Sequence, residues 1–327
     1  MTATIQLPIG DSEPVIAHSP SDAFASAATR GSFYEVLGAP GAPVVAILGG
    51  ISASKHFTSS PFDPTPGWWE NVVGRGRAID TDRFRVLGID YTSRSADASV
   101  VRTTDQADRL AAALDDLGVR RAHAVIGASY GGMVALAFGA RHRDRAGRLI
   151  VISAAHRSDP MATALRHLQR RVIELGSTTG REREAIAIAR GIAMTSYLTA
   201  QHLAERVPDS ADDDVQAVED RIGKFLKRSG EQFADLWTSE RYNSLSLSLD
   251  LHSVSPEAIE IPTSVIAVSG DRLVPIEDCR ELARRLSGPA QIIELDSPSG
   301  HDAFLGDASR ITTFITELLN LGAGAAQ

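Results

Sequence analysis

Residues 125–132 read Val-Ile-Gly-Ala-Ser-Tyr-Gly-Gly and contain a Gly-x-Ser-x-Gly pattern centred on Ser129. An apolar segment typical of a buried strand precedes the pattern, and an amphipathic helical segment follows it. Small residues two positions before and after the serine let strand and helix approach closely, and the strained turn exposes the serine Oγ. The helix N-terminus also directs amide groups towards developing negative charge. This context favours a nucleophile over the alternative, a glycine-rich turn without chemistry.

Buried strands and helices alternate on both sides of this turn. We expect strands at residues 33–37, 44–48, 84–89, 122–126, 149–152, 264–268 and 291–295, and helices at 103–117, 130–141, 277–286 and 302–320. Such alternation is typical of a mostly parallel sheet with helices on both faces.

One long stretch, residues 156–258, breaks the alternation, because it is helical in character and has no clear buried strand. We interpret it as an all-helical insertion, most simply a lid; the alternative is a packing subdomain without a role in chemistry. The core then comprises residues 31–155 and 259–321. Residues 1–30 are expected to form an irregular arm, and residues 322–327 a disordered tail.

A serine at its normal pKa is a weak nucleophile and needs an adjacent base. Asp271 follows the strand expected at 264–268 and Gly270, and His301 follows the strand expected at 291–295, so both should lie at the carboxyl edge of the sheet with Ser129. The order Ser, Asp, His is that of the α/β-hydrolase fold, which we predict here, mostly parallel and with a helical lid. The competing bases are His56, His202 and His252, and the competing acids are Asp278 and Asp296.

Two backbone amides should stabilise the oxyanion that forms when Ser129 attacks a carbonyl. One is expected to be that of Tyr130, the residue after the nucleophile. The other should come from the loop after the strand at 44–48, within residues 49–52.

A resemblance becomes visible at residues 67–84, which read Gly-Trp-Trp-Glu-Asn-Val-Val-Gly-Arg-Gly-Arg-Ala-Ile-Asp-Thr-Asp-Arg-Phe. The segment closely resembles the homoserine O-acyltransferases of the α/β-hydrolase fold, which carry Gly-Trp-Trp and then Val-Gly-x-Gly-Lys-Ala-Ile-Asp-Thr-Asp-Arg. Residues 129–133 (Ser-Tyr-Gly-Gly-Met) and 300–305 (Gly-His-Asp-Ala-Phe-Leu) are similar to that family as well. The stretch after Phe84 is shorter than in the family, so the chain looks like a shortened type.

The resemblance also implies roles for single residues. It points to Ile51 as the second oxyanion donor and to Asp302 as the ligand of the substrate amino group; the alternative for Asp302 is an N-cap of the last helix. In the lid, Tyr242 matches a substrate-binding tyrosine. The family's substrate-binding arginine falls on Leu236, so either nearby Arg241 takes its place or the acceptor differs.

The function implied is transfer of an acyl group from acetyl-CoA or succinyl-CoA, through an acyl-Ser129 intermediate, to homoserine or a related amino-alcohol in methionine and sulfur amino-acid biosynthesis. CoA would be a substrate, and no cofactor is expected. A homodimer through the lid helices is implied too. The first alternative is an esterase that uses water as acceptor, and the second is a non-catalytic binding module on the same scaffold.

Bulk composition is consistent with a soluble cytoplasmic enzyme. The chain has 327 residues, a formal net charge of −8 and one cysteine, Cys279, so an internal disulfide is excluded and nucleic-acid binding is disfavoured. We expect no secretory signal in residues 1–10 and no membrane span. We find no His-Glu-x-x-His motif and no clustered Cys and His residues at the spacing of a metal site. The glycines at 74–76 are not expected to follow a strand, as a dinucleotide-binding motif requires.

Overall fold

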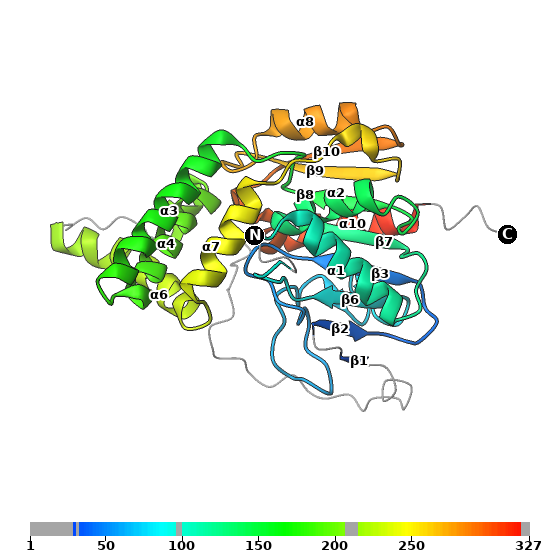
Figure 1. The fold of residues 1–327 in the computed structure, drawn as a ribbon, viewed down its shortest axis with the longest axis horizontal. Coiled ribbons are helices and arrows are strands. Elements are labelled where there is room, and N and C mark those ends of the chain that lie inside the picture. Colours follow the sequence, from blue (N-terminus) through cyan, green and yellow to red (C-terminus); the bar gives the residue numbers. More distant parts are fainter. Residues whose placement is uncertain (1–28, 31–32, 96–99, 207–214, 322–327) are drawn as a thin grey trace.

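The computed structural model describes residues 29–30, 33–95, 100–206 and 215–321, so the predicted arm at 1–30 falls almost wholly, and the tail at 322–327 entirely, outside the described residues. An eight-stranded sheet forms the centre, in the order β1-β2-β6-β3-β7-β8-β9-β10 (Figure 1). Its strands are β1 Thr29–Arg30, β2 Tyr34–Leu37, β3 Val44–Leu48, β6 Arg85–Ile89, β7 Ala124–Ala128, β8 Leu149–Ile152, β9 Thr263–Ser269 and β10 Ala290–Asp296.

The strands from β6 to β10 pair in parallel, and only β1 and β2 are antiparallel to their neighbours. Every residue of the central strands β3, β7 and β8 is buried, which accounts for their continuous apolar sequences. The predicted mostly parallel sheet is therefore confirmed. Several boundaries differ by one residue, and the largest shift is in the strand expected at 122–126, which runs from Ala124 to Ala128, while Ala122 forms an isolated bridge to Ala146.

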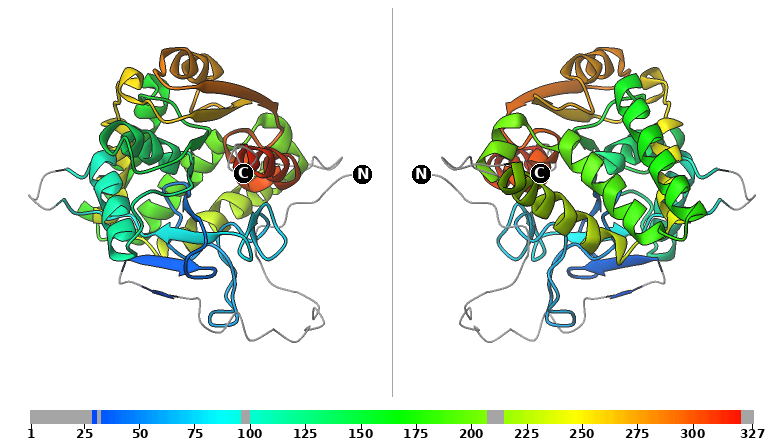
Figure 2. Two further views of the ribbon diagram at one scale, coloured as in Figure 1. Left: turned by 90° about the vertical axis from the view of Figure 1, so that its right-hand side faces the viewer. Right: turned by 90° about the vertical axis from the view of Figure 1, so that its left-hand side faces the viewer.

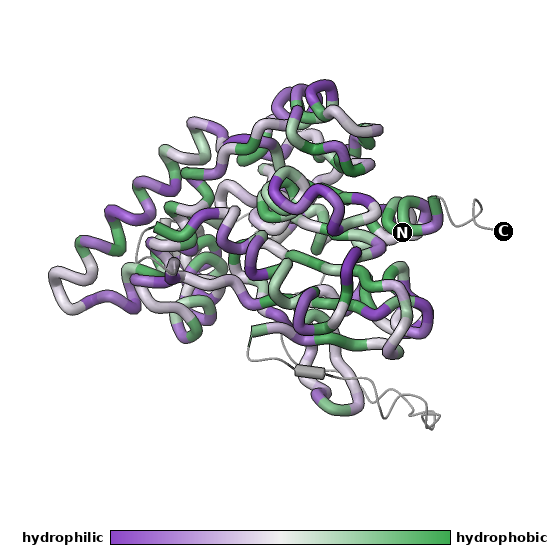
Figure 3. The backbone as a smooth tube through the Cα atoms, turned by 45° about the vertical axis from the view of Figure 1, so that its right-hand side comes forward, coloured by the Kyte–Doolittle hydropathy of each residue, from purple (hydrophilic) through white to green (hydrophobic). Residues whose placement is uncertain are grey.

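Helices cover both faces of the sheet (Figure 2). One hydrophobic core includes side chains from α1 (Thr103–Asp116), α2 (Tyr130–Arg141) and α8 (Ile276–Arg285). A second core includes side chains from α10 (Ala308–Asn320) and from the connection that carries the two adjacent tryptophans. In Figure 3, hydrophobic backbone segments alternate with hydrophilic ones, as expected for elements that are buried on one side.

Between β8 and β9 the described residues form helices and no strand of the sheet. The helices are α3 Pro160–Thr178, α4 Glu182–Tyr197, α5 Ala200–Arg206, α6 Val215–Ala234 and α7 Ser239–Asp250, followed by the 3-10 turn η2 Pro256–Ala258. Figure 1 shows them gathered beside one end of the sheet. None of the helices in the described part of the chain combines the length and apolar character needed to cross a membrane.

Two segments depart from the sequence prediction. The single helix expected at 302–320 is three elements, η3 (Gly300–Asp302), α9 (Ala303–Gly306) and α10, and the break between α9 and α10 lies at Asp307, which adopts a non-helical φ of −115° and ψ of 50°. The connection between β3 and β6, for which no strand is predicted, contains a short parallel pair, β4 (Val73–Gly74) and β5 (Ile79–Asp80). The Asp80 carboxylate accepts hydrogen bonds from the Gly76 and Asp82 amides, at 3.0 and 2.9 Å, which orders this short segment.

Candidate active site

Ser129 lies on the tight turn between β7 and α2. Its φ of 54° and ψ of −120° are unusual for a residue with a side chain, and such strain is concentrated at functional sites. The amide of Ser129 donates to the Ile152 carbonyl of the neighbouring strand at 2.9 Å, which holds the turn against the sheet. The turn therefore has the strain and the position that the sequence pattern predicts for a nucleophile.

The glycines on either side are required for close approach. A Cβ on Gly131 would lie 2.0 Å from the Leu48 carbonyl oxygen, and one on Gly127 would lie 2.1 Å from the Gly131 carbonyl oxygen. Both contacts are with backbone, which cannot move aside cheaply. The Gly131 amide also donates to the Gly49 carbonyl at 3.0 Å, so the turn is tied to the loop after β3.

We expect Gly131→Ala to destabilise the fold by about 1–3 kcal/mol or more, because the added methyl group overlaps backbone atoms. Thermal unfolding followed by circular dichroism measures the effect. Gly223→Ala is the matched control, since its Cβ meets nothing within 4 Å and alanine favours its helix. An unfolding temperature for Gly131→Ala equal to that of the control would contradict the close packing described above.

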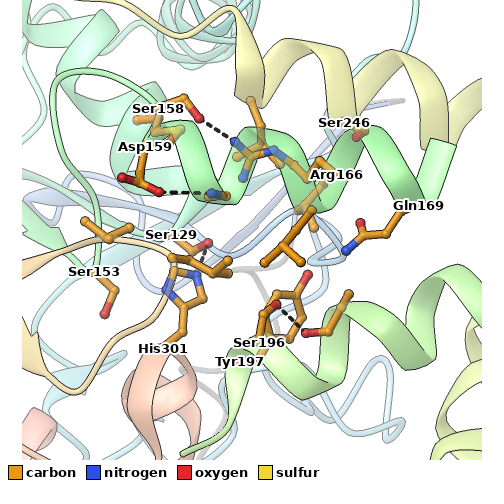
Figure 4. A pocket seen from close by; sticks show the side chains of 18 of the residues that line it. Ser129, Ser153, Ser158, Asp159, Arg166, Gln169, Ser196, Tyr197, Ser246 and His301 are labelled. Carbon is orange, nitrogen blue, oxygen red and sulfur yellow. Dashed lines mark hydrogen bonds between the residues drawn. The ribbon is translucent and has the colours of Figure 1, made fainter. Parts of the chain in front are cut away.

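His301 joins the serine to a buried acid. Its Nε2 lies 2.7 Å from Ser129 Oγ, and its Nδ1 lies 2.8 Å from Asp271 Oδ2. The remaining carboxylate oxygen of Asp271 accepts from the amides of Leu273 and Val274, at 2.8 and 3.0 Å. The Nδ1–H of a neutral imidazole donates to such a carboxylate, which leaves Nε2 free to accept the serine proton. Figure 4 shows the hydrogen bond between Ser129 and His301 at the edge of a pocket.

Two opposing effects act on the pKa of His301. Burial alone lowers it, but the negative charge and hydrogen bond of Asp271 outweigh burial, and the net result is a pKa above the ordinary 6.5. The Asp302 charge acts in the same direction as Asp271. The site therefore stabilises the imidazolium that would form when the serine proton is taken.

The competing bases from the sequence lie in other surroundings. His56 is bonded to the carboxylate of Glu35, with Nδ1 3.1 Å from Oε2. His252 is buried beside Thr103, and burial lowers its pKa to about 4. His202 lines a cavity that Ser129 also lines, but it is His301 whose ring nitrogen bonds the serine.

The competing acids are also engaged elsewhere. Asp278 lies 3.4 Å from Arg157 in an ion pair, and Asp296 accepts a hydrogen bond from Ser269 at 3.0 Å. Among the acids considered in the sequence, Asp271 is the one that the structure brings to the His301 ring.

The loop after β3 lies directly against the nucleophile. A Cβ on Gly50 would lie 3.9 Å from Ser129 Cβ, and the Gly49 carbonyl accepts from the Tyr91 hydroxyl at 2.7 Å. The amides of Ile51 and Tyr130 donate to no group in the part of the chain that the structure describes. These two amides are therefore available to a ligand beside Ser129.

The two adjacent tryptophans hold this loop and the His301 loop together. Trp68 and Trp69 stack with centroids 5.0 Å apart. The Trp68 indole donates to the Ser54 carbonyl at 3.0 Å, and the Trp69 indole donates to the Phe304 carbonyl at 2.9 Å. Trp69 is buried in the core, and its indole N–H joins segments 235 residues apart.

Two cavities meet at Ser129, one of about 480 Å³ and one of about 50 Å³. Both are lined by Ile51, Ser129, Arg190, Tyr197 and His301. An arrangement of this kind can give a nucleophile access to two reactants. Within the described residues no group of three or more His, Cys, Asp or Glu side chains could hold a metal ion.

Two of the residues implied as substrate ligands lie in these cavities. Asp302 lines the larger one and occupies the N-cap position of α9, but its side chain makes no capping hydrogen bond. Burial raises the pKa of Asp302, while the nearby charges of His301 and Arg190 oppose that rise. Tyr242 lines the smaller cavity, and its hydroxyl donates to Gln169 Oε1 at 2.8 Å.

The expectation for Arg241 needs correction, because this arginine lines neither cavity. Its guanidinium donates to the Tyr91 carbonyl at 3.2 Å and lies 4.9 Å from the centroid of the Trp237 ring. Leu236, which takes the place of the family's arginine, is 81% exposed. Neither residue is placed to contact a ligand beside Ser129.

Sequence reasoning missed two residues of the site. Arg190, on α4, lines both cavities. Ser153, at the end of β8, adopts a φ of 48°, and its buried Oγ has no hydrogen-bond partner among the described residues. Figure 4 shows Ser153 in the same pocket as Ser129. The place of Ser153 at the carboxyl end of a core strand was the available signal.

Comparison with known proteins agrees with this architecture. A family model described as the alpha/beta hydrolase fold matches residues 43–308. The chain is 42% identical over 293 residues to the homoserine O-succinyltransferase of Xanthomonas campestris pv. campestris, an alignment that covers 88% of this chain and 78% of that protein. It is 29% identical over 316 residues to the serine O-succinyltransferase of Litchfieldella anticariensis, with 83% and 86% covered.

The crystal structure of a homoserine O-acetyltransferase from Bacillus anthracis superimposes with a TM-score of 0.77 at 20% identity, covering 88% of this chain and 91% of that one. This likeness supports the fold alone. The predictions of fold and family made from the sequence are both confirmed. The chain has the α/β-hydrolase fold and belongs to the homoserine O-acyltransferase family.

Proposed function

We propose that this chain transfers an acyl group from an acyl-CoA to the hydroxyl of L-homoserine or a related amino acid such as serine, through an ester on Ser129. The observation that carries the proposal is the hydrogen-bonded series Ser129, His301 and Asp271 at the junction of two cavities. The similarity to a homoserine O-succinyltransferase and a serine O-succinyltransferase supports transfer to homoserine or serine. We place the reaction in methionine and sulfur amino-acid biosynthesis.

In the first half-reaction, His301 Nε2 takes the Ser129 proton while Oγ attacks the thioester carbonyl. The amides of Tyr130 and Ile51 stabilise the resulting oxyanion. Collapse of the tetrahedral intermediate breaks the carbon–sulfur bond, and His301 returns its proton to the thiolate. The products are free CoA and an acyl ester on Ser129.

In the second half-reaction, the acceptor hydroxyl gives its proton to His301 and attacks the acyl ester. Collapse of the second intermediate returns the proton to Ser129 Oγ and releases the acylated acceptor. Asp271 holds the imidazole tautomer throughout and stabilises the imidazolium. Ping-pong kinetics are expected, because CoA leaves before the acceptor reacts.

The alternative acceptor is water, which would make the chain an esterase. A donor-by-acceptor matrix separates the two functions: acetyl-, propionyl- and succinyl-CoA against homoserine, serine and simple alcohols, with thiol release and product mass measured. Acyl transfer predicts an O-acylated amino acid in the product spectrum. Thiol release that ignores every amino-alcohol would establish hydrolysis instead, and no turnover of any thioester or ester would leave only a binding role.

Asp302→Asn is expected to raise the KM for homoserine roughly 10- to 100-fold, because a charged hydrogen bond to the acceptor's ammonium group is lost. The rate of CoA release in a single acylation of Ser129 should change far less. Asp296→Asn, at an exposed acid outside both cavities, is the control. The role of Asp302 would be disproved if 4-hydroxybutanoate, which lacks the amino group, suffered the same loss as homoserine.

Assembly through the lid helices stays a prediction. Helix α3 exposes three apolar side chains at intervals of seven residues, Met161, Leu168 and Leu175, with 66%, 56% and 61% of their surface accessible. Seven-residue spacing places side chains on one side of a helix, as in paired helices.

A further inference from the structure

Arg190 lies on the side of α4 that faces the nucleophile. Ala193, Met194 and Tyr197, which follow it at helical spacing, each line one or both cavities. The guanidinium of Arg190 lies 5.2 Å from the centroid of the Tyr197 ring and 5.0 Å from that of Phe233. The Tyr197 ring is itself 5.7 Å from the His301 ring, so this cation is held close to the reacting atoms.

The charge of Arg190 has no acidic partner in the described part of the chain. Two other arginines also line the smaller cavity, and both are paired: Arg157 with Asp278 and Arg166 with Asp250. A half-buried cation without a counter-ion is unfavourable, and aromatic faces compensate it only in part. An anionic ligand would complete its surroundings.

An unpaired charge of opposite sign lines the same space. The Asp302 carboxylate makes no hydrogen bond or ion pair within the described residues, and it lines the larger cavity together with Arg190. The two side chains do not pair directly, although their charges influence one another. A carboxylate and a guanidinium that line one cavity without pairing are complementary to a zwitterion, whose ammonium group would bind the first and whose carboxylate would bind the second.

We propose that the Arg190 guanidinium binds a substrate carboxylate beside Ser129, while Asp302 binds the ammonium group of an amino-acid acceptor. The inference rests on the acyl-transfer function proposed above and names the residue that selects for a carboxylate. Arg190 lines both cavities, so the carboxylate that it binds could come from either substrate. It is the α-carboxylate of the acceptor or the distal carboxylate of a dicarboxylic acyl group such as succinyl.

The test compares substrates with and without each carboxylate in Arg190→Gln, Arg190→Lys and Arg183→Gln. The acceptors are homoserine and 3-aminopropan-1-ol, which is homoserine without its carboxylate, and the donors are acetyl-CoA and succinyl-CoA. Arg183 is the matched control, because it lies two turns earlier on α4, exposed and paired with Asp235 outside both cavities. Specificity is read as kcat/KM for each pair.

We expect Arg190→Gln to lower kcat/KM for homoserine roughly 10- to 100-fold and to leave 3-aminopropan-1-ol nearly unchanged. Arg190→Lys should recover part of the loss, since lysine keeps the charge without the planar fork. Arg183→Gln should behave as the unaltered protein. A loss confined to succinyl-CoA, with the acceptor ratio unchanged, also supports the proposal and assigns the carboxylate to the donor.

The proposal is overturned if both ratios, homoserine to 3-aminopropan-1-ol and succinyl-CoA to acetyl-CoA, are the same in Arg190→Gln and in the unaltered protein. That result includes a uniform loss of rate, which a purely structural role would give. Failure of the proposed function is visible separately, as absence of acylated acceptor with the unaltered protein. In that case the ratio of mono-4-nitrophenyl succinate to 4-nitrophenyl acetate hydrolysis still tests Arg190.

Discussion

Ser129→Ala is expected to lower kcat for acyl transfer roughly 10⁴- to 10⁶-fold, because the acyl intermediate of the proposed mechanism forms on its hydroxyl. The hydroxyl bonds the His301 ring, so its loss should leave the fold intact. The direct measurement is intact-protein mass spectrometry after incubation with acyl-CoA in the absence of acceptor. The unaltered protein should gain one acyl mass, and the variant should gain none.

Ser264→Ala is the control for this variant, since Ser264 lies on β9 outside both cavities and its hydroxyl accepts a hydrogen bond from the Gln291 side-chain amide. It should be acylated as fully as the unaltered protein, and the thermal unfolding of all three proteins should agree. Acylation that persists in Ser129→Ala would transfer the nucleophile role to another residue and remove the basis of the proposed mechanism.

Asp271→Asn should lower kcat by about 10⁴-fold, the scale known for the equivalent change in other enzymes with this triad. An asparagine amide can donate to Nδ1, which would place the ring proton on Nε2 and leave the Ser129 proton without an acceptor. Asp296→Asn, which alters the exposed competing acid, should have little effect. Equal losses in the two variants would show that Asp271 is not the orienting acid.

The same variant has a signature in the pH profile. His301 acts as base only when neutral, so kcat/KM should fall as pH drops through its pKa. Since that pKa is raised, the acid limb in the unaltered protein should have its midpoint above the ordinary 6.5. Asp271→Asn removes the negative charge that outweighs burial, so the midpoint should move to lower pH, and an unmoved midpoint would contradict this cause.

Local patterns predicted the sheet and the turn that carries Ser129 well. The segment at 149–152 is apolar at every position, and β8 has the same bounds because a strand buried on both faces admits no polar alternation. The Gly-x-Ser-x-Gly turn was recognisable because its glycines are imposed by contacts within a few residues and with the neighbouring strand. His301 and Asp271 followed from strand order, and the structure brings their side chains to 2.8 Å.

The remaining parts of the site depend on contacts that no local pattern encodes. Arg190 and Arg241 are both helix arginines, and only the packing of α4 and α7 decides which one faces a cavity. The bond from Trp69 to Phe304 crosses 235 residues of sequence. The break at Asp307 directly follows Gly306, a helix-stop signal that was not used when the sequence was interpreted as one continuous helix.

The turn η3 carries His301 and Asp302 as consecutive residues. For an acceptor held through its ammonium group by Asp302, the group that binds it and the base lie on the same short turn, so motion of the surrounding helices alone leaves the spacing between them unchanged. The turn then favours amino-alcohols in which the number of bonds between nitrogen and hydroxyl fits that spacing. Changing the acceptor preference by one methylene group would therefore require changes in the walls of the cavity, since the spacing between the two groups on the turn stays the same.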